Sequence, residues 1–221
     1  MRIVDLTSPV GTDTYSPPSV NQPIEITVHH KEPGFWMVSD IKMMLHAGSH
    51  VDFTKHFQED GETAEMISLD RTCGEAVVID LTPVEPDHDI TVADLEAAAP
   101  EIRSGDVVLV KTGWSDQAWG DFPRYYVGSP ACSPEAARWL VETGAKAIGF
   151  DCFPERSAKK QSYLPSEFVV HEIIGQAGAV LMQTLTNLAE LPVGERFLFF
   201  GAFLKVKGGE GAPARFFAVL D

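Results

Sequence analysis

The chain has 221 residues, of which 44% are hydrophobic and 22% charged, and this length is enough for one sizeable core. We therefore expect a single globular domain over residues 1–221. Its 32 acidic and 17 basic residues give a formal net charge of −15, and a surface this negative repels phosphate backbones and anionic lipids. The composition thus argues against a nucleic-acid partner and against binding to a membrane.

Short β-branched or alternating runs predict strands along the whole chain. In chain order they cover Arg2–Leu6, Glu25–His30, Val38–Leu45, Ala76–Leu81, Val107–Lys111, Ala147–Phe150, Ala179–Leu181, Phe197–Val206 and Ala214–Leu220. A stretch rich in proline and serine, from Thr12 to Pro23, predicts a long loop. The glycines of "KGGEGAP" predict a turn between the last two strands.

Start and stop residues predict three helices between the strands. They run from Thr91 to Pro100, from Ser133 to Gly144, and from Pro165 or Ser166 to Gly178. Thr91 is a capping residue with Asp94 three positions later, and Pro134 occupies the first helical position after Ser133. Strands and helices alternate in the middle of the chain while both ends are strand-rich, so we expect an α/β fold with a mixed sheet.

The spacing of the cysteines and the first residues of the chain predict the cellular compartment. The three cysteines are scattered and form no Cys-x-x-Cys pair, so we expect reduced thiols. The first residues, "MRIVDLTSPV", lack the pattern of a signal peptide. We therefore expect a cytoplasmic protein.

Three of the seven histidines lie in the stretch "LHAGSHVDFTKHF", together with an aspartate. In an extended strand His46, His50, Asp52 and His56 would share one face, but the first two histidines would be about 13 Å apart. One metal ion cannot bridge that distance, since its ligand bonds are about 2 Å long. A shared metal requires a bend in the strand, which costs least at Gly48. The spacing alone leaves a metal site and a solvated cluster on a loop both open.

The segment "HAGSHVDFTKH" resembles the signature H-x-G-T-H-x-D-x-P-x-H of the metal-dependent cyclase-like hydrolase family, which includes bacterial kynurenine formamidase and isatin hydrolase. Ser49 replaces threonine and Thr54 replaces proline, while every metal or catalytic position is kept. Further likenesses at "IVDLT", "VLVKTGW", "AIGFD", "LTNLAEL" and "KGGEGAPAR" extend the resemblance over most of the chain. It implies a swivelling β/β/α cyclase-like fold with a mixed β-sheet.

The resemblance also implies roles for the clustered residues. In that family the first two histidines and the aspartate bind the metal, which here means His46, His50 and Asp52. The last histidine of the signature, here His56, acts as proton donor and acceptor. In the kynurenine formamidase branch a later histidine, which matches His171, helps to hold a second zinc.

Gln183 stands where that branch has a glutamate that also holds the second zinc. A glutamate can bridge two cations through two anionic oxygens, whereas a glutamine offers one neutral carbonyl oxygen. We therefore infer one divalent metal ion, Mn²⁺ or Zn²⁺, with Gln183 as a ligand, similar to the isatin hydrolase branch. Glu172 would point about 100° away from His171 on a helix, so we do not expect it to replace the missing carboxylate.

Three further residues are candidates for the substrate region. His171 is either a buried histidine held by one hydrogen bond or a residue beside the metal or substrate. Phe35 and Trp36 would form either an aromatic wall of a substrate pocket or a contact between subunits. The resemblance implies a homodimer or a higher homo-oligomer.

Together these features predict a metal-dependent hydrolase that cleaves a small amide, lactam or related acyl compound with metal-activated water. His56 would pass a proton to the leaving nitrogen. The alternatives are a kynurenine formamidase with two zincs, a metal-dependent cyclase or dehydratase, and a non-catalytic metal-binding protein. A small molecule is the expected substrate in each enzymatic case.

Overall fold

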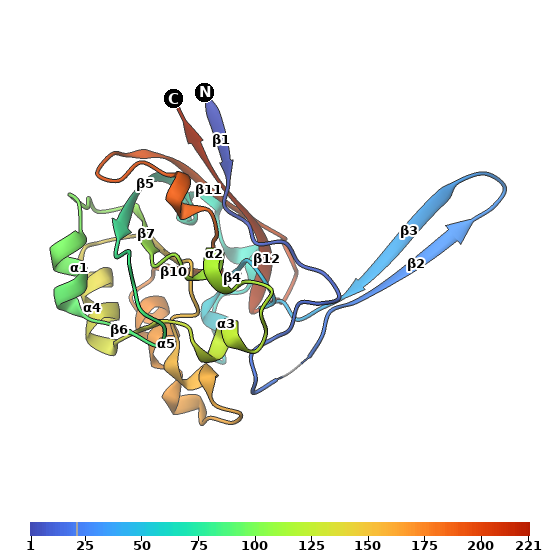
Figure 1. Cartoon of the computed structure of the whole chain (residues 1–221), viewed down its shortest axis with the longest axis horizontal. Coiled ribbons are helices and arrows are strands. Elements are labelled where there is room, and N and C mark those ends of the chain that lie inside the picture. Colours follow the sequence, from blue (N-terminus) through green and yellow to red (C-terminus); the bar gives the residue numbers. More distant parts are fainter. Residues whose placement is uncertain (21) are drawn as a thin grey trace.

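The computed structural model describes residues 1–20 and 22–221, and its centre is a mixed eight-stranded β-sheet (Figure 1). The strands of this sheet are β1 (Arg2–Asp5), β4 (His50–Asp52), β5 (Cys73–Asp80), β7 (Val107–Lys111), β9 (Ala147–Phe150), β10 (Val180–Gln183), β11 (Phe197–Phe203) and β12 (Gly211–Leu220). Their order is β1-β12-β11-β5-β7-β9-β10-β4, and β4 also pairs with β12. The second pairing of β4 closes the seven strands from β12 to β4 into a barrel, which confirms the α/β fold with a mixed sheet.

Helices cover one face of the parallel strands, as Figure 1 shows for α1, α4 and α5. The α-helices are α1 (Val92–Ala98), α2 (Trp114–Ala118), α3 (Arg124–Val127), α4 (Pro134–Glu142) and α5 (Val169–Gln176). Period-2 alternation divides the side chains of β7 between two cores. Val108 and Val110 join the apolar cluster under the helices, whereas Val107 and Leu109 join the cluster inside the barrel.

The predicted helix caps are confirmed at two of the three helices. At α1, Thr91 accepts a hydrogen bond from the backbone N–H of Asp94, whose side chain accepts one in return. At α4, Ser133 is the N-cap and Pro134 follows it. The third prediction is corrected, because residues 165–167 form a separate 3₁₀ turn and α5 begins only at Val169.

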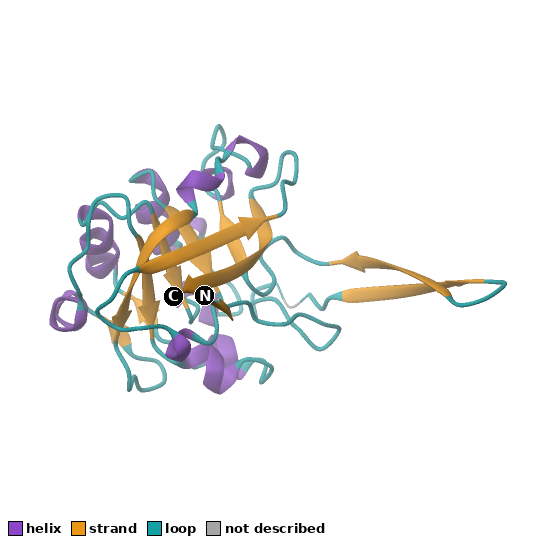
Figure 2. Cartoon of the chain, turned by 90° about the horizontal axis from the view of Figure 1, so that it is seen from above, coloured by secondary structure: helices purple, strands orange, loops and turns teal. Residues whose placement is uncertain are grey.

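Two strands lie outside the barrel and form an arm. β2 (Glu25–Lys31) and β3 (Trp36–Lys42) pair antiparallel and project far from the rest of the chain (Figure 2). The predicted strand Val38–Leu45 does not run into the histidine motif, because β3 ends at Lys42 and turns precede β4. The predicted bend at Gly48 is confirmed, since its φ is +66°.

Short elements complete the structure. They are β6 (Asp89–Ile90), β8 (Ala131–Cys132) and the 3₁₀ turns η1 (Thr54–His56), η2 (Ala64–Met66), η3 (Leu69–Arg71), η4 (Arg156–Lys159), η5 (Pro165–Glu167) and η6 (Leu188–Glu190). The predicted loop 12–23 contains turns and a bridge between Tyr15 and Pro23, and Asn21 lies outside the described residues. None of the helices in the described part of the chain has the length and apolarity that a membrane crossing needs.

Candidate metal centre

Strand register places three polar side chains together on the helix-covered face of the barrel. In the antiparallel β4–β10 pair, His50 lies opposite Gln183 and Asp52 lies opposite Leu181. Directly opposed residues project to the same face, so the side chains of His50, Asp52 and Gln183 meet. All three are buried. The intervening Val51 turns to the other face and packs inside the barrel.

The turn before β4 fixes the orientation of His50. Gly48 has a left-handed φ of +66°, and a Cβ there would lie 2.2 Å from Val10 Cγ1, so only glycine fits. Its carbonyl oxygen accepts a hydrogen bond of 2.7 Å from His50 Nδ1. The lone pair on His50 Nε2 is therefore left facing the centre, 3.5 Å from Asp52 Oδ1.

His46 is held between two carboxylates. Its Nδ1 lies 2.7 Å from Asp52 Oδ1, and its Nε2 lies 3.3 Å from Glu210 Oε1. Burial alone would lower the pKa of His46, but the two carboxylates raise it to about 9. Gly211 permits this packing, since a Cβ there would lie 2.5 Å from the ring of His46. The His46–Asp52 contact shows that the bend brings both ends of the motif to one point.

His171 reaches the same point from α5. Its ring is buried, and its Nδ1 lies 3.1 Å from Glu155 Oε2. The same carboxylate oxygen accepts a hydrogen bond of 2.9 Å from the backbone N–H of Val170, and so it also caps α5. Nε2 of His171 points inward, 3.6 Å from Asp52 Oδ2 and 2.8 Å from Gln183 Nε2.

The amide of Gln183 lies among these groups. Its Nε2 is 2.5 Å from Asp52 Oδ2 and 3.3 Å from His50 Nε2, whereas its Oε1 is buried without a hydrogen-bond partner. An unpaired buried acceptor costs about 1–3 kcal/mol. Rotating the amide by 180° would exchange Oε1 with Nε2. The oxygen would then lie beside Asp52, His50 and His171, where a bound cation would satisfy it. The orphaned oxygen therefore fits a site built for a positive ion.

His56 lies at the edge of this centre, on η1. Its ring stacks on His46 with centroids 4.1 Å apart and lies 5.9 Å from the ring of His171. Burial, aided by repulsion from the neighbouring histidines, lowers the pKa of His56 to about 4, even though Asp52 opposes the shift. His56 is thus a neutral imidazole at pH 7.

These residues form two candidate ligand groups that share Asp52. Suitable atoms of His46, His50 and Asp52 lie within 4.8 Å of one another, and so do those of Asp52, His56 and His171. The structure therefore brings together every residue that the sequence predicted for metal binding and proton transfer, with His171 beside them.

A cavity opens on the centre and has an apolar wall. His46, His50, His56, His171 and Gln183 line its floor. Met44, Phe153, Tyr163 and Phe168 line its sides, next to the loop residues Pro17, Ser19 and Val20. Phe35 and Trp36 were candidates for this wall, but they sit at the tip of the arm and are 85% and 65% exposed. They do not line the cavity of their own chain.

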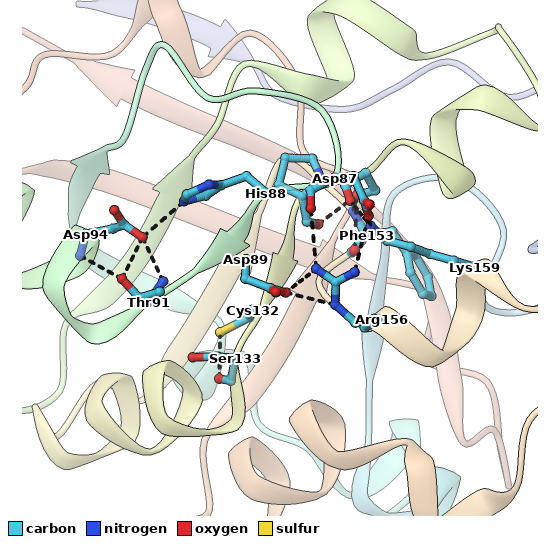
Figure 3. Close-up of polar contacts among 12 residues, drawn as sticks. Asp87, His88, Asp89, Thr91, Asp94, Cys132, Ser133, Phe153, Arg156 and Lys159 are labelled. Atoms are coloured by element: carbon cyan, nitrogen blue, oxygen red, sulfur yellow. Dashed lines mark hydrogen bonds and ion pairs between the residues drawn. The ribbon is translucent and has the colours of Figure 1, made fainter.

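Ion pairs at the surface hold the segment that carries Glu155 and Phe153, as Figure 3 shows. Arg156 Nε donates to Asp89 Oδ1 at 2.8 Å, and Arg156 also pairs with Asp87. Lys159 pairs with Asp87 as well. Each of these exposed pairs contributes little on its own, but together they fix both ends of η4.

Glu155 and Glu210 were missed by sequence reasoning. Glu210 lies in "KGGEGAP", where the glycines indicated only a turn, and Glu155 follows the predicted strand Ala147–Phe150. Each carboxylate lies against the outer nitrogen of a clustered histidine. The contacts join residues 164 and 16 positions apart, so no local pattern could have revealed them.

Comparison with known proteins gives these observations a context. The Cyclase family model, described as a putative cyclase, matches residues 4–154, more than half of the chain. The kynurenine formamidase of Salinibacter ruber is 26% identical over 182 residues, covering 80% of this chain and 77% of that protein. The kynurenine formamidase of Erythrobacter litoralis is 35% identical over 116 residues, which cover 52% of this chain and about half of that enzyme, 48%.

A solved structure agrees with these matches. Isatin hydrolase A from Ralstonia solanacearum superposes with a TM-score of 0.81 at 27% identity, covering 100% of this chain and 92% of that one. The formamidase and isatin hydrolase relatives, together with the His/Asp cluster, support a metal-dependent hydrolase. The chain belongs to the putative cyclase family.

Proposed function

We propose that this protein hydrolyses a small aromatic amide or lactam and that isatin-like cyclic amides are its preferred class. The observation that carries the proposal is the convergence of three histidines on Asp52 and Gln183. His50, His46 and His171 each have their outer nitrogen against an oxygen acceptor, so the inner nitrogen of each ring faces the centre. Such outer contacts are typical of histidines that bind metals.

One divalent ion, Mn²⁺ or Zn²⁺, would be held by His46, His50, Asp52 and Gln183. Nitrogen, carboxylate and amide oxygen donors suit either metal. The buried, unpartnered Oε1 of Gln183 supports its assignment as a ligand. When bound, such an ion supplies Lewis acidity and lowers the pKa of water.

The residues around this position would carry the proton chemistry. His56, neutral and at the edge of the cavity, would take a proton from water and return it to the leaving nitrogen. Its stacking on His46 holds the ring over the floor of the cavity. Phe153, Tyr163 and Phe168 would hold a flat ring and exclude water from the reacting carbonyl.

The cavity lining favours an uncharged substrate. Among the described residues that line it, none is lysine or arginine. An amino-acid substrate such as N-formylkynurenine carries a carboxylate, which would find no lysine or arginine partner there. The neutral ring of isatin needs none.

The second candidate is a kynurenine formamidase with two ions. The shared position of Asp52 in both ligand groups favours it, because a carboxylate can bridge two cations. Gln183 opposes it, because a neutral amide cannot supply the second bridging charge.

A metal-replacement assay tests the proposal. The purified protein is stripped with a chelator, reloaded with Mn²⁺ or Zn²⁺, and assayed with isatin, N-formylkynurenine and simple lactones. We expect metal-dependent opening of isatin at a higher kcat/KM than for N-formylkynurenine. A loaded protein that prefers N-formylkynurenine would favour the second candidate, and one that cleaves none of the compounds would contradict the hydrolase assignment of this site.

We also propose a cytoplasmic homodimer. The three cysteines are free, which suits a reducing compartment. The exposed apolar arm supports association, because a monomer rarely leaves such a surface in water.

A further inference from the structure

Thr184, the residue after Gln183, has a backbone conformation that its side chain disfavours. Its φ is +61°, in the left-handed region, and the residue is buried. Threonine branches at Cβ, and branched residues rarely adopt a positive φ because Cβ then crowds the backbone. Such a conformation persists only where neighbouring groups hold it, and it is found most often at functional sites.

The left-handed turn at Thr184 follows the last pair between β4 and β10. That pair is His50 with Gln183. Beyond it the two strands diverge, because the carbonyl oxygen of Ser49 accepts a hydrogen bond of 2.9 Å from the backbone N–H of Ala214 on β12. Two candidate metal ligands thus lie at the end of a ladder, and their position depends on what holds the chain beyond it.

Side-chain hydroxyls hold the chain beyond that pair. Ser49 Oγ donates to the carbonyl oxygen of Thr184 at 2.6 Å, and Ser8 Oγ donates to the same oxygen at 3.2 Å. The backbone N–H of Ser8 donates to Ser49 Oγ at 2.9 Å, which orients that hydroxyl. All three residues are buried. Ser49 precedes His50 and Thr184 follows Gln183, so one hydroxyl links the backbone beside each candidate ligand.

Tyr125 holds the side chain of Thr184. Its hydroxyl donates to Thr184 Oγ1 at 3.3 Å and lies 3.4 Å from Ser115 Oγ. Ser115 Oγ in turn donates to the carbonyl oxygen of Asp151 at 2.5 Å, at the end of β9. Tyr125 is fully buried, and burial raises its pKa, so the hydroxyl keeps its proton and can donate.

Ser8, Ser49 and Tyr125 together form a hydroxyl clamp around Thr184. We infer that the clamp positions the side chain of Gln183 for the metal by keeping the next residue in its left-handed conformation. Without the clamp, a threonine at this position would relax to a negative φ, which would rotate the adjoining peptide and displace the amide of Gln183. The part played by Gln183 rests on the proposed function, whereas the hold of the clamp on Thr184 does not.

Calorimetric titration with Mn²⁺ tests the positioning role. Ser49→Ala should weaken Mn²⁺ binding about 10–100-fold, the usual effect of losing a group that orients a ligand from outside. Adding Thr184→Asn should restore most of this affinity, because asparagine adopts a positive φ far more readily than threonine. A loss that Thr184→Asn fails to restore would overturn the inference, since Ser49 would then act on its neighbour His50 directly.

Thr72→Val is the matched control for the loss of one buried hydroxyl. Thr72 is buried, and its Oγ1 donates to the carbonyl oxygen of Gly201 on β11 at 2.8 Å, outside the candidate metal centre. This variant should unfold at a lower temperature but bind Mn²⁺ as the wild type does. An equal fall in affinity in Thr72→Val and Ser49→Ala would mean that general destabilisation weakens binding, which would contradict a positioning role.

Thermal unfolding of the metal-free protein tests the clamp without a ligand. Thr184→Asn should raise Tm by about 2–4 °C, because it relieves the cost of a branched residue at positive φ. Ser49→Ala should lower Tm less in the Thr184→Asn protein than in the wild type, since asparagine depends less on the clamp. No rise in Tm, or equal losses in both backgrounds, would contradict the hold on Thr184. If the losses differed but the wild type bound no Mn²⁺, the hold on Thr184 would be confirmed and the proposed function contradicted.

Discussion

The candidate metal centre and the arm differ from ordinary protein structure in opposite ways. At the centre, charged and polar side chains such as Asp52 and His50 are buried. On the arm, large apolar side chains such as Phe35 and Trp36 are exposed. Burying a charge without a partner costs several kcal/mol, and exposing apolar surface forgoes about 25 cal/mol per Å².

Each departure indicates a partner of matching chemistry. A cation would satisfy the carboxylate and the unpaired amide oxygen of Gln183 at the centre. A second apolar surface would cover the arm. The comparison shows that buried polar side chains and exposed apolar side chains both indicate what the chain binds.

Replacing His56, the proposed proton carrier, should have the largest effect. His56→Ala should lower kcat about 10²–10⁴-fold, the usual contribution of a general acid–base group, while the bound metal remains. Rate measurements with metal analysis check this. His88→Ala is the control, because His88 is half-buried and pairs with Asp94 outside the centre. Loss of metal from the His56 variant would make His56 a ligand.

Glu155 should act through His171, and its loss should have the next largest effect. Glu155→Gln removes the charge while an amide oxygen can still accept from Val170, so the cap of α5 is kept. Outer contacts of this kind are worth about 10–100-fold in metal affinity or activity.

Calorimetric titration with Mn²⁺ and the pH profile of kcat separate this positioning role from a structural one. Glu172→Gln is the matched control, since Glu172 lies in the first turn of α5 but is exposed and accepts a hydrogen bond from Gln176. Equal metal affinity and equal pH profiles in the two variants would contradict a positioning role for Glu155.

Gln183→Glu tests how many metal ions the site binds. The change is nearly isosteric and replaces a neutral oxygen with an anionic one, so the first divalent ion should bind more tightly. At high zinc, a second ion should bind between Asp52 and His171, which already lie 3.6 Å apart. Activity should fall, because added ligand charge makes the ion a weaker Lewis acid. Unchanged affinity and stoichiometry would mean that Gln183 is not a ligand.

The smallest expected effect is that of a substitution in the arm on the concentration dependence of Tm. For the proposed wild-type dimer, a tenfold rise in protein concentration should raise Tm by roughly 2 °C through mass action. Ile41→Thr keeps the β-branched shape but weakens the apolar face, so its Tm should depend less on concentration. Scanning calorimetry at several concentrations decides this, and identical slopes for both proteins would contradict a dimer held by the arm.

Local patterns predicted much of the fold. The runs at Val107–Lys111 and Ala147–Phe150 matched β7 and β9, because buried parallel strands are continuous apolar segments. The bend at Gly48 followed from the reach of a single metal ion. By contrast, β3 shows the same alternation as a barrel strand, so its sequence could not reveal that it belongs to a projecting arm.

The candidate site was predictable only in part, for the same reason. The motif around His46 and His50 is local, and Gln183 was predicted separately, from the family resemblance at the run "LTNL" that follows it. Glu155 and Glu210 come from distant loops, and tertiary packing alone brings them to the histidines. The division between Glu167 and Val169 likewise follows from a cap that Glu155 supplies across the fold.

The metal position itself gives the most direct test. Crystals grown with Mn²⁺ and measured at wavelengths on both sides of the manganese absorption edge locate the ion by anomalous scattering. We predict one peak per chain, at about 2.0–2.3 Å from donor atoms of His46, His50, Asp52 and Gln183. Two peaks within about 4 Å of each other, or one peak without Gln183 in contact, would contradict the single-ion site.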